Sequence, residues 1–182
     1  MANAVLVCTM VREFVEEGNP YFVAAAREII PNVQRLVETE LAKGSKVFFC
    51  NDWHTEGDLE WERMFPRHCV AGTPQAETIP DLARYPGEML PITRFDGFIY
   101  SKLEQKLHEA RPEKVIVCGV CTHIPVLHTA AGAAMRDYLV EVPTDCVADF
   151  DPEMHQFALR QMKEVFGVKL TTSQELAAAV AR

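Results

Sequence analysis

Residues 115–135 read VIVCGVCTHIPVLHTAAGAAM, and this stretch decides the fold. Residues 115–118 form a short, wholly apolar run, which is typical of a strand buried on both faces. Residues 124–135 have the composition of a buried helix, and Pro125 suits its first turn because a missing N–H costs little there. A strand, a short elbow and a helix in this order predict one unit of a parallel sheet covered by helices.

The same alternation extends in both directions along the chain. Further strands are expected at residues 4–8, 46–50, 138–142 and 168–170. Helices are expected at 22–43 (broken near Pro31 and ended by Gly44), 98–110, 152–166 and 172–180, and 55–94 are expected to be loops with short helices. We therefore predict one α/β domain over residues 1–182: a three-layer αβα, doubly wound, mainly parallel and Rossmann-like sheet.

Composition narrows the classes of partner. Of the 182 residues, 48% are hydrophobic and 24% charged, and the net charge of −8 argues against a nucleic-acid or anionic-membrane surface. No apolar run approaches the ~20 residues of a membrane span, and no basic stretch precedes the first apolar run as in a signal peptide. Cys8, Cys50, Cys118 and Cys146 lie in or next to expected strands, which is the usage of buried free thiols in a reducing compartment. We expect a cytoplasmic protein.

Ligands of such folds bind beyond the carboxyl ends of the strands, so the residues after each strand carry the candidate sites. Asp52 and His54 directly follow the second expected strand and point the same way in extended chain. His68 lies on a loop long enough to return to them. Two imidazoles and a carboxylate form a common ligand set for Zn, Fe or Mn. The structural alternative is that Asp52 caps a turn and both histidines hydrogen bond locally.

Two further patterns lie in the elbow after the central strand. Cys118 and Cys121 form a C-x-x-C, which indicates either a redox pair or two inert packed thiols. Cys121, Thr122 and His123 lead into the helix, where free backbone N–H groups could stabilise an oxyanion. His123 is a candidate acid–base group, although a histidine near a helix start is more often a structural hydrogen bonder.

Several of these segments together resemble the isochorismatase-like hydrolases, the superfamily of nicotinamidases, N-carbamoylsarcosine amidases and isochorismatases. The resemblance runs almost end to end. It is carried by residues 4–14 (AVLVCTMVREF), 51–54 (NDWH) with 65–74 (FPRHCVAGTP), 93–98 (TRFDGF), 115–126 (VIVCGVCTHIPV), 151–155 (DPEMH) and 171–172 (TT). It implies the same three-layer fold as the alternation of strands and helices.

The resemblance also implies catalytic positions, and here the chain departs from the family. The family's chemistry uses an aspartate, a lysine and a nucleophilic cysteine, which fall on Thr9, Ile92 and Pro125. Thr9 is a weak base, Ile92 carries no charge, and Pro125 has neither a nucleophile nor an N–H. Loss of all three argues against cysteine amidase chemistry. The family's metal positions fall on Asp52, His54 and His68, and its cis peptide is expected at Cys121–Thr122.

Three functions remain open from the sequence. The first is a hydrolase in which a divalent metal activates water against a small amide, ureido or vinyl-ether compound, with Arg94, Cys121 and Thr122 as substrate-binding residues and His123 moving protons. The second is a catalytically inactive homologue that keeps the pocket as a binding or oligomer-forming subunit. The third is a thiol redox protein using Cys118 and Cys121. The resemblance further implies a small-molecule ligand and a homo-oligomer.

Overall fold

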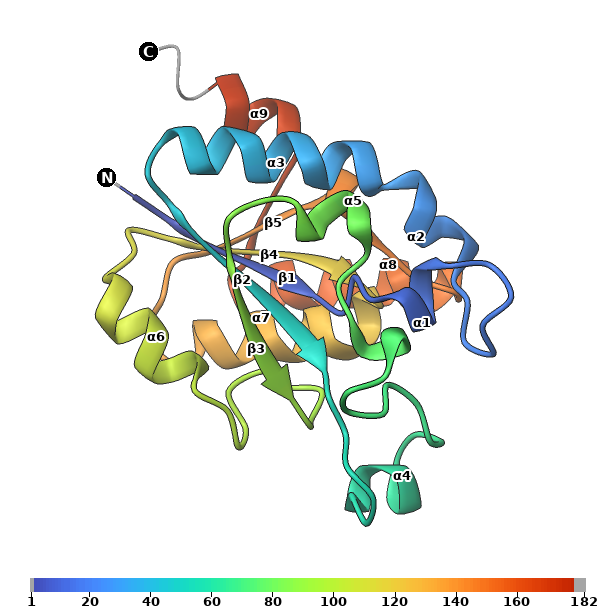
Figure 1. Ribbon diagram of the computed structural model, residues 1–182. Helices are drawn as coiled ribbons and strands as arrows, with labels where there is room; N and C mark the ends of the chain where they lie inside the picture. The colour runs from blue at the N-terminus through green and yellow to red at the C-terminus, as the bar shows by residue number, and fades with distance from the viewer. Residues whose placement is uncertain (1, 179–182) are drawn as a thin grey trace.

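The computed structural model describes residues 2–178, and over this range the chain forms a seven-stranded parallel sheet. The strand order is β3-β2-β1-β4-β5-β7, with β6 paired to β4 beyond the end of β5 (Figure 1). The strands are β1 (Ala4–Cys8), β2 (Lys46–Asp52), β3 (Glu88–Ile92), β4 (Val115–Val120), β5 (Val140–Pro143), β6 (Val147–Ala148) and β7 (Lys169–Thr171). This arrangement confirms the predicted α/β fold class.

Helices cover both faces of the sheet. The helix α3 (Ile30–Ala42) lies with α9 (Ser173–Ala178) on one face, and α7 (Leu127–Ala134) lies with α8 (Pro152–Glu164) on the other (Figure 1). The shorter helices are α1 (Arg12–Val15), α2 (Ala24–Glu28), α4 (Leu59–Arg63), α5 (Pro80–Ala83) and α6 (Leu103–Ala110). The α4 segment projects from the sheet below the carboxyl end of β2 (Figure 1). The result is the three-layer arrangement that the alternating pattern predicts.

The central strands are the most apolar part of the chain. Every residue of β1 and β4 is buried, because helices cover both sides of them. Each residue of β1 pairs in parallel with β2 on one side and with β4 on the other. The carboxyl ends of these three strands therefore lie side by side, and the loops that follow them share one edge of the sheet.

Several boundaries differ from those expected. The strand β3 lies inside the stretch expected to form loops and short helices; it is an edge strand that contains Pro91 and buries only Leu90 and Ile92. The expected helix at 98–110 begins only at Leu103, because Asp96 and Ser101 hold the preceding residues in turns. The strand β4 continues to Val120, because its last two residues pair with β6. The expected helix 172–180 corresponds to α9, and residues 179–180 lie outside the described range.

Within residues 2–178, no helix is both long enough and apolar enough to cross a bilayer.

The contact between β1 and β4 gives a test of the fold. Gly119 has φ +110°, and a Cβ added there would lie 2.1 Å from the carbonyl oxygen of Cys8. We expect Gly119→Ala to lower the free energy of unfolding by about 3 kcal/mol or more, measured by urea denaturation. Gly167→Ala is the matched control, because Gly167 also has positive φ (+66°) but open space around its Cα. It should cost about 1 kcal/mol. Equal losses in the two variants would contradict the close approach.

Candidate metal-binding pocket

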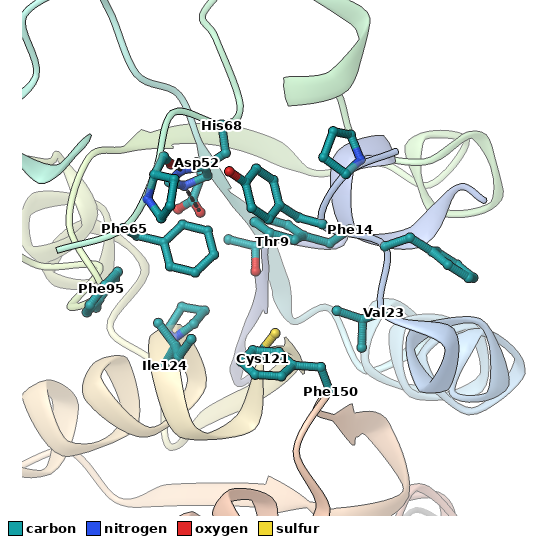
Figure 2. Close-up of a pocket in the computed structure, with 15 residues that line it drawn as sticks. Thr9, Phe14, Val23, Asp52, Phe65, His68, Phe95, Cys121, Ile124 and Phe150 are labelled. Atoms are coloured by element: carbon teal, nitrogen blue, oxygen red, sulfur yellow. Dashed lines mark hydrogen bonds and ion pairs between the residues drawn. The ribbon is translucent and has the colours of Figure 1, made fainter. Parts of the chain in front are cut away.

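A pocket of about 370 Å³ lies at the carboxyl edge of the sheet. Aromatic and aliphatic side chains form most of its wall, with Asp52 and His68 at one end and Cys121 at the other (Figure 2). Its lining residues are Thr9, Phe14, Pro20, Tyr21, Phe22, Val23, Asp52, Phe65, Pro66, His68, Phe95, Cys121, Ile124, Pro125 and Phe150. Among these described lining residues there is no lysine or arginine. The pocket has the size and apolar lining of a small-molecule site.

The three predicted metal ligands lie together at one end of this pocket. One ligand atom from each of Asp52, His54 and His68 lies within 4.8 Å of the others. Asp52 is the last residue of β2, and His54 follows two positions later. The His54 N–H donates to the carbonyl of Cys69 at 3.0 Å, and the Ala71 N–H donates back to the His54 carbonyl at 2.8 Å. These backbone bonds hold the returning loop beside His54 and so place His68 opposite Asp52.

Hydrogen bonds on the far side of each imidazole fix which nitrogen faces the site. His68 Nδ1 donates to the carbonyl of Pro66 at 2.7 Å, since a carbonyl can only accept. His68 Nε2 then faces Asp52 Oδ2 at 3.3 Å (Figure 2). Burial lowers the pKa of His68, but the hydrogen bond and charge of Asp52 outweigh it and raise that pKa above its ordinary value. A cation is required here, either as a proton on His68 or as a metal ion.

A second carboxylate, Glu60, lies on the other side of His54. Its Oε1 atom is 3.5 Å from His54 Nε2, and its side chain is only 1% exposed. Neither His54 Nε2 nor Glu60 Oε2 has a hydrogen-bond partner among the described residues. Burial, followed by the negative charge of Asp52, raises the pKa of Glu60 to about 7. These two buried polar atoms lack partners in the described part of the chain and lie beside Asp52 and His68. Such a group of atoms is what a divalent cation would require around it.

Asp58 connects this site to Arg94. Asp58 Oδ2 lies 2.9 Å from His54 Nδ1, and Asp58 Oδ1 accepts a hydrogen bond of 2.8 Å from Arg94 Nη1. Burial raises the pKa of Asp58, but hydrogen bonds from the Glu60 N–H, His54 and Arg94 hold it below its ordinary value. Arg94 was predicted to bind substrate. The structure instead places its guanidinium on Asp58 and outside the described pocket wall, because the buried Asp58 carboxylate needs a positive partner.

The three positions of the missing triad lie close to the pocket without reactive groups. The Thr9 hydroxyl donates to the carbonyl of Val120, so it is already used within the fold. Pro125 lines the pocket from inside the short π-helical turn Thr122–Val126. Ile92 is buried at the end of β3 beside Asp52 and is not among the described lining residues. The three positions that carry reactive groups in the family's chemistry therefore carry none in this chain.

The other predicted elbow residues make structural contacts. Thr122 is fully buried and shares a 2.8 Å hydrogen bond with His155, which removes its hydroxyl from the pocket. His123 contacts Asp149 through both its backbone N–H (2.8 Å) and its Nδ1 (2.7 Å). These bonds tie the elbow to the segment before α8. Of the elbow residues predicted to contact a ligand, Cys121 is the one that lines the pocket.

One expectation about the elbow was wrong. The cis peptide bond is Val120–Cys121 and not Cys121–Thr122, and it directly follows the last residue that pairs with β6. Cys118 and Cys121 are free, buried thiols, which favours the alternative of two inert packed thiols over a redox pair. Burial raises the pKa of both thiols, whereas a redox pair requires an accessible thiol with a lowered pKa.

The comparisons with known proteins agree with this architecture. Residues 3–175 match the sequence model of the isochorismatase domain family, and the chain belongs to that family. A "probable inactive nicotinamidase" of Arabidopsis thaliana is 31% identical over 95% of this chain and 93% of its own length. The structure of an isochorismatase-like hydrolase from Alkaliphilus metalliredigens is similar with a TM-score of 0.89 and 28% identity, covering 99% of this chain and 100% of the other.

A further similar structure contains a metal. It is the pyrazinamidase of Pyrococcus horikoshii in complex with zinc, with a TM-score of 0.85 and 29% identity over 94% of this chain and 99% of the other. Together the comparisons confirm the predicted family. They identify relatives that are hydrolases and one whose name describes it as inactive.

Asp58 and Glu60 were not predicted as site residues. Both lie in the charged stretch EGDLEWER (56–63), which has the composition of a solvated surface helix. The one available signal was spacing, since Asp58 lies four residues after His54 and α4 begins directly after it. The structure buries Glu60 and leaves the Asp58 side chain only 8% exposed, because α4 folds back over His54, with the Trp61 ring centre 5.6 Å from that of the imidazole.

The burial of the thiols gives a direct test of the redox alternative. We expect the five cysteines outside the pocket wall not to react with a maleimide within minutes at pH 7.5 in the native protein, because burial hinders access to them. Cys121 lines the pocket and should react slowly, because burial raises the pKa of its thiol. All six should react after unfolding in urea. Rapid native labelling of Cys118 and Cys121, read by peptide mass spectrometry, would restore the redox interpretation.

Proposed function

We propose that this chain binds a divalent metal ion through Asp52, His54 and His68 and holds a small, uncharged, largely apolar molecule beside it, without using cysteine chemistry. The observation that carries this proposal is the set of buried polar atoms that face one another without adequate partners. His68 Nε2 faces the Asp52 carboxylate, and His54 Nε2 lies beside Glu60 without a hydrogen bond in the described chain. A cation among them would satisfy all four groups.

The residues present fit a metal ion in their chemistry. Asp52, His54 and His68 would hold it, with Glu60 close enough to His54 to serve as a further ligand. Ligand atoms around a tetrahedral zinc lie about 3.3 Å apart, the separation that already exists between His68 and Asp52. A bound divalent ion would supply Lewis acidity and lower the pKa of a coordinated water toward about 7. The zinc complex of the related pyrazinamidase supports the same assignment.

The class of ligand follows from the pocket wall. Six aromatic side chains contribute to it: Phe14, Tyr21, Phe22, Phe65, Phe95 and Phe150. Within the described wall the one acidic residue is Asp52, and no lysine or arginine balances it. An anionic ligand would therefore find a positive partner only at the metal end of the pocket, and the rest of the wall would not compensate its lost hydration. A neutral molecule with an apolar ring and one heteroatom turned toward Asp52 and His68 fits this wall best.

The chain's own residues do not supply the family's covalent step. Thr9, Ile92 and Pro125 lack the acid, the charge and the nucleophile, and burial keeps the Cys121 thiol protonated. This favours a binding role. The 31% identical Arabidopsis thaliana relative, named a probable inactive nicotinamidase, supports the same view.

A second candidate is hydrolysis of a small amide, ureido or vinyl-ether compound by metal-activated water. One observation favours it: Asp52 and His68 both line the pocket, so the ligand set opens toward a bound molecule. In this case Asp52 and His68 would hold the ion at the end of the pocket, and the aromatic wall would position the compound and exclude bulk water. Turnover distinguishes this candidate from the binding role.

Metal content tests the shared part of both functions. After reconstitution with zinc or manganese and removal of excess metal, we expect about one ion per chain in the wild type. His54→Ala and His68→Ala should retain less than about a tenth of it, since each removes a ligand. His108→Ala is the matched control, because this exposed histidine lies on α6.

A hydrolysis screen on the metal-loaded wild type, using small amides and ureido compounds, then separates the two candidates. Metal binding without turnover supports the binding role. Metal-dependent turnover that is lost in His68→Ala supports hydrolysis and contradicts the binding role. Absence of bound metal would contradict both.

The ligand class can be tested with two probes of nearly equal shape. In metal-free protein we expect benzamide to bind at least about 10-fold more tightly than benzoate, equivalent to about 1.4 kcal/mol, because His68 already pairs with Asp52 and the wall offers no lysine or arginine to an anion. Isothermal calorimetry at pH 7.5 measures the difference, and Asp52→Asn should reduce it. Tighter binding of benzoate would show that a positive group reaches the pocket.

A further inference from the structure

The carboxylate of Asp58 is the best-connected group behind the metal-binding residues. It is 8% exposed and lies at the start of α4. Its Oδ1 atom accepts the Glu60 N–H at 3.0 Å and Arg94 Nη1 at 2.8 Å, and its Oδ2 atom lies 2.9 Å from His54 Nδ1. It therefore contacts α4, the segment after β3 and the loop after β2 at once.

Arg94 keeps this carboxylate in place. Its side chain is 20% exposed, and its guanidinium also lies over the ring of Tyr100, 5.5 Å from the ring centre. Asp58 Oδ1 accepts hydrogen bonds from two donors, Arg94 Nη1 and the Glu60 N–H, so the carboxylate acts as an acceptor. An ionised carboxylate only accepts hydrogen bonds, so His54 Nδ1 must be the donor in the contact with Asp58.

The direction of that hydrogen bond determines what His54 offers to the site. With the proton on Nδ1, a neutral His54 presents the Nε2 lone pair to the space near Asp52, Glu60 and His68. Outer carboxylates of this kind orient a metal-binding histidine and increase its basicity. We propose that Asp58, held by Arg94, is a positioning residue that keeps His54 in the Nδ1–H form for metal binding. This inference rests on the proposed metal site.

A purely structural role for Asp58 makes a different prediction. Asp58 also caps α4 through the Glu60 N–H, and loss of a cap alone would loosen that helix without selecting a histidine tautomer. Three substitutions separate the roles. Asp58→Asn keeps its oxygen on the Glu60 N–H and Arg94 but turns its NH2 donor toward His54 Nδ1. Asp58→Ser keeps the cap but is too short to reach His54, and Asp58→Ala keeps neither.

The experiment measures two quantities for the full chain. Nitrogen-15 NMR of the histidine rings at pH 8.5, in metal-free protein, reports which nitrogen of His54 carries the proton. Competition with a zinc chelator reports zinc affinity. We expect Nδ1–H in the wild type and Nε2–H in Asp58→Asn, Asp58→Ser and Asp58→Ala. Zinc affinity should fall about 10- to 100-fold in all three variants, including Asp58→Asn, which keeps the helix cap.

Removing Arg94 provides an independent variant that leaves the cap residue intact. Arg94→Met should weaken zinc binding in the same direction but by less than Asp58→Ser, because His54 and the Glu60 N–H still hold Asp58. Wild-type tautomer and affinity in Asp58→Ser would overturn the inference and reduce Asp58 to a helix cap. An Nε2–H tautomer in the wild type would also overturn it. Because the tautomer is read without metal, this result does not depend on whether the wild type binds zinc.

Discussion

The pairing of β1 with β2 on one side and with β4 on the other is the constraint on which the pocket depends. Parallel pairing aligns the carboxyl ends of these strands, so Thr9, Asp52 and Cys121 come to one edge of the sheet although they are far apart in sequence. The register is tight, since Gly119 leaves no room for a side chain against Cys8. The loops that follow these strands converge at this edge, and ligands of such folds bind where the loops converge.

Candidate metal ligands meet at this edge of the sheet, whereas the three positions that the family resemblance assigns to the catalytic triad carry no reactive groups. Each histidine of the candidate metal site is held by a contact behind it, His68 by a carbonyl and His54 by Asp58. Thr9, Ile92 and Pro125 stand at the triad positions, and aromatic rings line the neighbouring pocket (Figure 2). Buried carboxylates and imidazoles are costly without a partner, and the proposed cation would supply one.

Much of this architecture could be predicted from the sequence, because continuous apolar runs and helical periodicity report burial directly. The order of elements and the grouping of Asp52 with His68 follow from where strands end. The edge strand β3 could not be predicted, since three of its five residues are exposed and proline is unusual in strands. The site roles of Asp58 and Glu60, and the pairing of Arg94 with Asp58, could not be predicted either. Their charges indicate a solvated helix, and only tertiary packing of α4 over His54 takes them out of solvent.

Anomalous diffraction at the zinc edge, from crystals of the zinc-soaked protein, tests the central claim most directly because it locates the ion as well as detecting it. The account predicts one strong peak bounded by Asp52, His54 and His68, at the end of the aromatic pocket. A crystal without a peak there, with the His68 imidazole still bonded directly to Asp52, would contradict it. Asp52 and His68 would then form a structural ion pair, and the pocket would have neither a bound metal nor a nucleophile.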